Sequence, residues 1–293
     1  MSDTVASLRH KIGNAKDLES VVRTMKAMAA SNIGQYENAV HALDDYYRTV
    51  QLGLAACFRQ DKTPAADSRA TQKTAAAIGV IVFGSDQGMV GQFNESMVDF
   101  AVDMLGKLPG KKIVWVVGAR IDSRLAETSL QPVAGFTLPN SINAITSLVG
   151  QILIEIEAQR EQGLIEQVYL FHNRPVSGSI YIPASQRLLP LDETWQRKLS
   201  GISWPTQNLP EVINSRERTL RALLREYLFV TLFRACSESL ASENASRLAA
   251  MQRADKNIEE MLVDLNGTFH RLRQSDIDEE LFDVISGYEA LQE

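Results

Sequence analysis

Proline is missing from both ends of the chain, and cysteine is scarce throughout. All nine prolines of the 293 residues lie between Pro64 and Pro210, as do 12 of the 17 glycines. Because proline costs a helix interior about 3 kcal/mol and glycine about 1 kcal/mol, both ends can form long helices, whereas the middle cannot be one helix. Cys57 and Cys236 are far apart with no CxxC pattern, so we expect buried thiols rather than a disulfide or a zinc site.

Long apolar runs are also absent. The longest covers residues 75–83, whereas a membrane span needs about 20 residues, so no direct membrane insertion is expected. The N-terminus lacks the apolar core of a signal peptide and the composition of a transit peptide, which favours a mature, cytosol-facing protein. A formal net charge of -6 and a pI near 5.4 give no whole-protein reason to expect nucleic acid as a partner.

The two proline-free ends carry apolar stripes whose steps alternate between three and four residues. The first stripe runs from Leu8 to Cys57, and the last runs from Leu248 to Leu272 with Asp255 as its polar member. This spacing is typical of a helix seam. A helix from residue 212 to about 291 would be roughly 120 Å long and needs a helical partner, so we expect a long antiparallel two-helix coiled coil. Two separate amphipathic helices packed on a globular core are the alternative.

The middle alternates short β-branched runs with helical stretches, which predicts a Rossmann-like α/β domain with a parallel or mixed sheet. We therefore divide the chain into an N-terminal coiled-coil helix (1–63), a central α/β domain with connector (64–210) and a C-terminal coiled-coil helix (211–293). The predicted strands are 76–83, 112–117 and 166–172, an edge strand or hairpin follows in 177–190, and the predicted helices are 93–107, 119–127 and 142–161.

Motifs for chemistry are missing or incomplete. The glycine-rich turn at residues 84–94 (GSDQGMVGQFN) lacks the spacing of a dinucleotide or P-loop motif, and a tight turn allowed by Gly88 and Gly91 is the simpler interpretation. The four histidines have no second metal ligand nearby, and the acidic group at 276–283 is typical of a solvated or partner-facing surface. The sequence contains no G-x-S-x-G or H-E-x-x-H motif. No catalytic, cofactor or metal site is predicted.

Four segments together resemble the γ subunit of F-type rotary ATP synthases. They are residues 8–31 with TMKAMAAS, the loop 84–94, residues 242–265, and residues 271–291 with RLRQSDID. They span both ends and the central domain in the family's order. The departures from the family pattern are Gln87, Val90 and Gln92 in the loop and Asp278 on the last helix, which indicate a divergent bacterial member.

The resemblance implies a rotor rather than an enzyme. The coiled coil would turn inside a hexamer of α and β subunits, and the central domain would lie near the membrane ring. Expected partners are the α and β subunits, the ε subunit and the membrane c-ring, with no cofactor and with the catalytic sites on β. The expected location is peripheral, on the cytoplasmic face of a bacterial membrane. The coupling ion, proton or sodium, stays open.

The resemblance also implies partner-binding residues. Arg273 and Gln274 match an Arg-Gln pair that contacts a β-subunit loop, and Met25 and Lys26 match a Met-Lys step on the opposing helix. Arg can give charge-assisted hydrogen bonds to a carboxylate, and Gln both donates and accepts. Two other hypotheses are a nucleotide-binding α/β enzyme with helical dimerisation arms and a coiled-coil adaptor protein.

Overall fold

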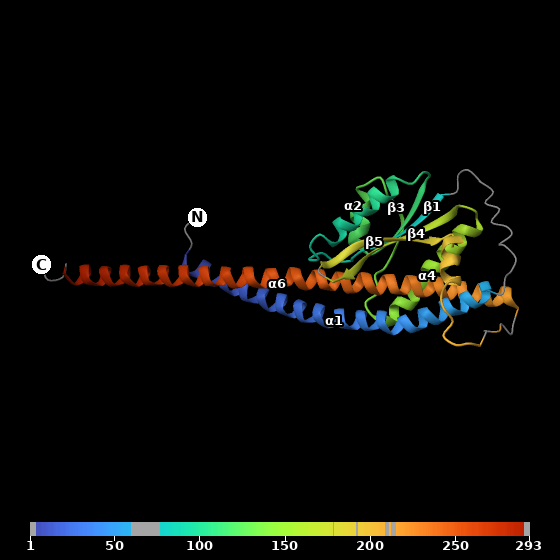
Figure 1. Ribbon diagram of the computed structural model, residues 1–293. Coiled ribbons are helices and arrows are strands. Elements are labelled where there is room, and N and C mark those ends of the chain that lie inside the picture. Colours follow the sequence, from blue (N-terminus) through green and yellow to red (C-terminus); the bar gives the residue numbers. More distant parts are fainter. Residues whose placement is uncertain are drawn as a thin grey trace. The chain divides into compact units, whose positions relative to one another are not determined.

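The computed structural model describes residues 4–59, 77–177, 179–191, 193–208, 211 and 215–289. Its contacts divide the chain into two units: a terminal unit (Met1–Ala30 with Arg247–Glu293) and a sheet unit (Ser31–Ser246). Two long helices contribute to both units. In chain order the elements are α1 (Val5–Arg59), β1 (Ala77–Phe83), α2 (Phe93–Gly106), β2 (Lys112–Val117), α3 (Ala119–Ala126), β3 (Pro132–Phe136), α4 (Ile142–Glu161), β4 (Ile165–Val176), β5 (Ser179–Leu189), α5 (Glu193–Ser200) and α6 (Arg216–Glu289) (Figure 1).

Helices α1 and α6 form an antiparallel pair within each unit. In the terminal unit, Lys26 contacts Asp255 and Arg23 contacts Glu259, so the numbering rises on one helix as it falls on the other. In the sheet unit, Asp44 contacts Arg234 and Tyr47 contacts Tyr227, which gives the same antiparallel sense. The seam of α1 has a seven-residue repeat, which is the period of a coiled coil. Its buried members are Leu8, Ala15, Val22, Ala29, Tyr36, Val50 and Cys57.

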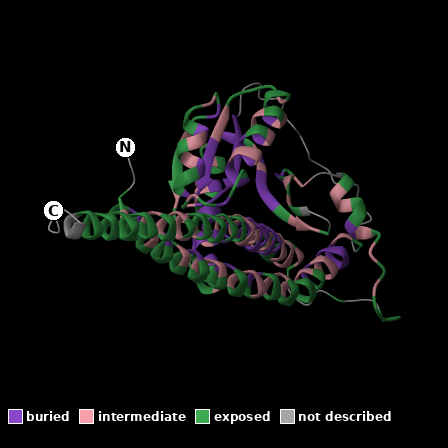
Figure 2. Cartoon of the chain, turned by 90° about the vertical axis from the view of Figure 1, so that its left-hand side faces the viewer, coloured by how far each residue is buried: buried purple, intermediate pink, exposed green. Residues whose placement is uncertain are grey.

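The sheet unit is built on a five-stranded mixed sheet with the order β3-β2-β1-β4-β5. Strands β1 to β4 run parallel, and β5 pairs antiparallel with β4. Alternate residues of each strand face opposite layers. One face packs against α2 and α3, and the other packs against α4 and part of α6. The three central strands β2, β1 and β4 are mostly buried, whereas the edge strands β3 and β5 and the outer helix faces are largely exposed or half-buried (Figure 2).

The predicted fold class is confirmed, with two omissions among its elements. Strand β3 and helix α5 were not predicted; α5 lies in what we expected to be a connector. Leu18, which the three-and-four spacing places in the predicted stripe between Leu8 and Cys57, is 53% exposed. The proposed domain boundaries at 63/64 and 210/211 fall at or beside residues outside the described ranges, so the division remains a prediction.

Two smaller expectations concern thiols and the membrane. Cys57 and Cys236 are both free and buried, as expected for inert thiols. Burial raises the pKa of the Cys236 thiol and, to a smaller extent, that of Cys57. No helix among the described residues combines the length and apolar character needed to cross a bilayer.

Candidate functional site

The terminal unit carries all four predicted partner-binding residues, and an apolar seam lies beside two of them, Met25 and Lys26. Val22 of α1 packs with Met251 and Ile258 of α6, and each of these side chains is buried. Met25 is half-buried and packs against the same cluster. Met25 therefore packs against the seam while remaining partly accessible.

Lys26 lies beside this seam and is engaged within the chain. Its Nζ donates to Oδ2 of Asp255 at 2.9 Å. Asp255 is the residue that interrupts the apolar stripe of α6, and its side chain is only 12% exposed. The partner for this buried charge comes from the opposing helix, 229 positions earlier in the sequence. A buried carboxylate needs such a partner, which explains how a charge is accommodated in the seam.

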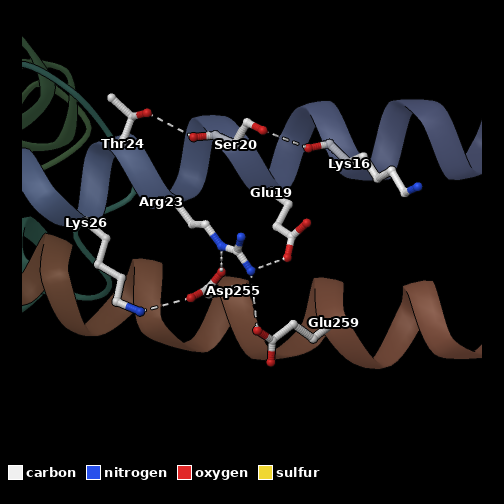
Figure 3. Close-up of polar contacts among 8 residues, drawn as sticks. All are labelled: Lys16, Glu19, Ser20, Arg23, Thr24, Lys26, Asp255 and Glu259. Carbon is white, nitrogen blue, oxygen red and sulfur yellow. Dashed lines mark hydrogen bonds and ion pairs between the residues drawn. The ribbon is translucent and has the colours of Figure 1, made fainter.

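Arg23 extends the contact into a five-residue cluster (Figure 3). Its guanidinium lies 3.7 Å from Asp255, 2.5 Å from Glu19 and 3.7 Å from Glu259. The carboxylate oxygens of these three acids lie within 4.8 Å of one another, a spacing that could hold a metal ion. Because Arg23 contacts all three, the cation at this cluster is supplied by the chain itself.

The cluster shifts the titration of Asp255. The hydrogen bond from Lys26 is the main cause that lowers the pKa of this carboxyl, partial burial opposes it, and the positive charges of Lys26 and Arg23 add to the lowering. A carboxyl with a lowered pKa in the folded state stabilises the fold above its unfolded pKa, near 4. That contribution is lost as the pH falls through the lower, folded pKa.

We expect Asp255→Asn to destabilise the terminal unit at pH 7, because Lys26 and Arg23 lose their charged partner. The difference in melting temperature between wild type and variant should begin to shrink as the pH falls below about 4 and should vanish below the lower, folded pKa of Asp255, where the wild-type carboxyl is protonated too. Thermal unfolding of the full chain at several pH values measures this. Asp264→Asn, at an exposed position of α6, is the control. A difference that stays constant with pH would contradict the assignment.

Arg273 and Gln274 are placed differently. Both are exposed on α6, and neither forms a hydrogen bond or ion pair with the residues that the structure describes. Arg273 follows Asp255, the contact of Lys26, by 18 positions, or about 27 Å along the helix at 1.5 Å per residue. The two predicted pairs are therefore not brought together; they are separate positions along the coiled coil.

Exposed apolar side chains follow this pair toward the end of α6, and our sequence reasoning did not single them out. They begin at Ile277, five positions after the last seam residue Leu272, and recur at steps of three and four residues among themselves (277, 281, 284 or 285), a signal that was available in the sequence. These side chains cannot be explained by packing within the described chain, and a run of this kind indicates a partner surface. The exposed members are Ile277, Leu281, Phe282, Val284 and Ile285.

The glycine-rich turn after β1 is closed by its own side chains. Asn94 accepts from the backbone N–H of Ser85 at 3.0 Å and donates to its hydroxyl at 2.8 Å. Asp86 accepts from the N–H of Ala119 at 2.8 Å, at the start of α3, where a phosphate would otherwise find donors. Positive φ occurs at Met89 and Gly91 but not at Gly88, so the need for glycine in this turn is evident at Gly91, and a role for Gly88 stays a prediction.

Comparison with known proteins gives one consistent result. Residues 4–291 match the family model described as ATP synthase. The ATP synthase gamma chain of an Anaeromyxobacter species is 28% identical over 298 residues, which cover 99% of both chains. That of Brevibacillus brevis is 25% identical over 299 residues, again 99% of each chain. This chain belongs to the ATP synthase γ-subunit family.

Solved structures share the fold of this family member. The mitochondrial ATP synthase of Euglena gracilis in rotational state 3 contains a chain with a TM-score of 0.67 and 18% identity, over 98% of this chain and 94% of that one. The rotor of the same enzyme in rotational state 1 gives a TM-score of 0.62 with 18% identity, over 93% and 98%. The two long helices and the central sheet are thus the fold of known ATP synthase central stalks.

The departures from the family pattern occupy two kinds of position. Val90 is 2% exposed and fits as an apolar side chain. Gln87, Gln92 and Asp278 are exposed, so they change the surface rather than the packing.

Proposed function

We propose that this family member is the central-stalk rotor that carries torque between an ion-driven membrane ring and a catalytic hexamer of α and β subunits. The match to the γ-subunit family across residues 4–291 is the observation that carries the proposal. In this role the chain is itself non-catalytic and needs no cofactor, and the nucleotide sites belong to the β subunits. The closed turn after β1 supports this view, because its donors are already used within the chain.

The two-helix seam supplies the stiffness that a rotor needs. Buried side chains recur every seven residues along α1, so relative twisting of the two helices would disturb many interdigitated contacts. In the terminal unit the Lys26–Asp255 contact adds a directional bond between the helices. Torque applied to one helix is therefore shared by the other.

The end of α6 is the proposed bearing surface for the α and β subunits. The exposed apolar residues from Ile277 to Ile285 would meet apolar side chains of the hexamer, while Arg273 and Gln274 would bind polar groups of a β-subunit loop. Met25 and Lys26 are proposed as a second contact. Lys26 keeps two N–H donors besides the one given to Asp255, so it can bind a partner without leaving its own ion pair.

Affinity purification through a tag on this chain tests the proposal. We expect one copy of the chain per hexamer of α and β subunits, together with ε and the c-ring, in a complex at the cytoplasmic face of the membrane. A nucleotide-binding enzyme would instead purify as a homo-oligomer that binds ATP or NAD specifically. A coiled-coil adaptor protein would co-purify with proteins other than these subunits. Either result would contradict the rotor assignment.

Arg273→Ala is expected to lower the coupled ATP turnover of the complex by about tenfold, which corresponds to about 1.4 kcal/mol, the scale of one charge-assisted hydrogen bond. The fold should be unaffected because Arg273 has no described intramolecular partner. ATP hydrolysis and ion pumping of the purified complex measure the effect. Arg271→Ala is the control, since Arg271 points about 200° away around the helix and bonds to Thr268 and the carbonyl of Gly267. Equal activity of both variants and wild type would remove the role of Arg273.

A further inference from the structure

One face of α6 in the sheet unit carries polar side chains at four-residue intervals, each bonded to the sheet or to a loop that leaves it. Glu238 contacts Nε2 of His172 on β4 at 2.9 Å. Ser242 donates to the carbonyl oxygen of Asn173, also on β4, at 3.2 Å. Ser246 donates to the carbonyl oxygen of Val90, in the turn after β1, at 2.5 Å. Residues four apart lie on one helix face, so these contacts form a single polar row.

The Glu238 contact is buried and extends to the other long helix. Glu238 and His172 are 7% and 6% exposed. The second carboxylate oxygen of Glu238 accepts from Nε of Arg234 at 2.8 Å, and Nη1 of Arg234 donates to Asp44 of α1 at 3.0 Å. A continuous series of side-chain hydrogen bonds, Asp44–Arg234–Glu238–His172, thus joins α1, α6 and β4.

The hydrogen-bond partners of His172 and Glu238 indicate which of their atoms carry protons. Nδ1 of His172 is buried with no hydrogen-bond partner among the described residues, which assigns the proton to Nε2, the donor to Glu238. Burial acts to raise the pKa of Glu238, but the hydrogen bonds from His172 and Arg234 outweigh it and hold the pKa below its usual value. Glu238 is therefore a charged acceptor shared by two donors.

The row occupies the place where open α/β sheets bind ligands. Strand β2, which follows β1 in the sequence, pairs with one edge of β1, and the later strand β4 pairs with its other edge. The strand order therefore reverses between β1 and β4, which is the topological switch point of the sheet. Their pairing ends at Val82 and Phe171, which places His172 and Asn173 at the carboxyl end of β1. Ligands of such sheets bind in the crevice outside these strand ends. Here the hydroxyls of Ser242 and Ser246 on α6 donate hydrogen bonds to the backbone carbonyl oxygens of Asn173 and Val90 at that crevice.

We propose that the polar row Glu238–Ser242–Ser246, with its partners His172, Asn173 and Val90, is the joint through which the sheet and α6 move as one body, in the crevice that related sheets use for a ligand. This inference rests on the proposed rotor function. Apolar packing alone permits small slides of a helix across a sheet, because it is non-directional. Hydrogen bonds to fixed backbone carbonyls and to a buried histidine fix the position of α6 along and around its axis. Glu238 and the two serines are positioning residues in this scheme.

The test uses the assembled complex and compares ion pumping with ATP hydrolysis. Glu238→Ala removes two hydrogen bonds to a charged carboxylate and should lower the number of ions pumped per ATP hydrolysed by about tenfold or more, while hydrolysis continues. Glu238→Gln keeps the size of the side chain; its amide oxygen can accept from Arg234 while its NH2 group donates to Nε2 of His172 in the other tautomer, so it should restore part of the coupling. Glu226→Ala is the matched control, because exposed Glu226 of α6 bonds to Tyr46 of α1 and leaves the sheet contacts intact.

A second readout does not depend on the complex. In the full chain alone, hydrogen exchange of the β4 amides around His172 and of the α6 amides around Ser242 should quicken together in Glu238→Ala, with no change in Glu226→Ala. If Glu238→Ala does not assemble, the double variant Ser242→Ala with Ser246→Ala carries the same prediction. Normal coupling together with wild-type exchange would overturn the joint while leaving the rotor function standing. A chain that never joins α and β subunits would overturn the rotor function instead.

Discussion

Replacing Ile258 by Asp is expected to destabilise the terminal unit by about 3 to 5 kcal/mol. Ile258 is 5% exposed and packs against Val22 and Met251 in the seam. A carboxylate there would lose its hydration and leave an apolar contact unfilled. Asp255 and Glu259, both close on the same helix, would add repulsion. Urea unfolding of the full chain, followed by its helical circular dichroism, measures the loss.

Val263→Asp is the matched control for this substitution. Val263 lies on the same helix but is 72% exposed, so the same chemical change should alter the free energy of unfolding by no more than about 0.5 kcal/mol. Equal effects at the two positions would show that the seam has been assigned to the wrong face of α6. Wild-type stability of Ile258→Asp would have the same meaning.

Gly84→Ala is expected to destabilise the sheet unit by about 1 to 3 kcal/mol or more, as overpacking of a close approach does. A Cβ at Gly84 would lie 2.3 Å from Cβ of Ile121 and 2.9 Å from Oδ1 of Asn94. Ile121 is fully buried on α3, so the helix itself would have to move. Thermal unfolding of the full chain gives the size of the effect.

Gly88→Ala provides the comparison within the same turn. A Cβ at Gly88 meets nothing within 4 Å, and its φ lies outside the positive range, so little change is expected. The pair of variants separates two explanations of this glycine-rich turn. If Gly88→Ala were the more damaging change, the turn would depend on backbone freedom at Gly88 rather than on close packing at Gly84.

The helices and central strands could be predicted because their signals are local. The seam of α1 repeats within each stretch of seven residues, and β1 is an unbroken apolar run. Strand β3 carries a proline and a glycine in five residues and depends on pairing with β2. Helix α5 is held by contacts that the sequence does not display, such as the bond from Nε1 of Trp195 to the hydroxyl of Tyr227 at 2.9 Å.

The site was predictable in its residues but not in its geometry. Asp255 was visible as a polar break in an apolar stripe, yet the pattern could not name its partner. The register between two helices that are 229 positions apart at this contact is decided by packing along the seam. The same holds for His172, which looked like a histidine without a partner until the fold placed Glu238 beside it.

Locking the chain to one β subunit tests the rotor account most directly. Gln274→Cys introduces an exposed thiol while Cys57 and Cys236 stay buried, so a cleavable photo-cross-linker can be attached at this position alone. The account predicts that cross-linking position 274 to a β subunit stops most of the ATP turnover of the complex, and that cleaving the linker restores it. Full turnover in a completely cross-linked complex would contradict the account.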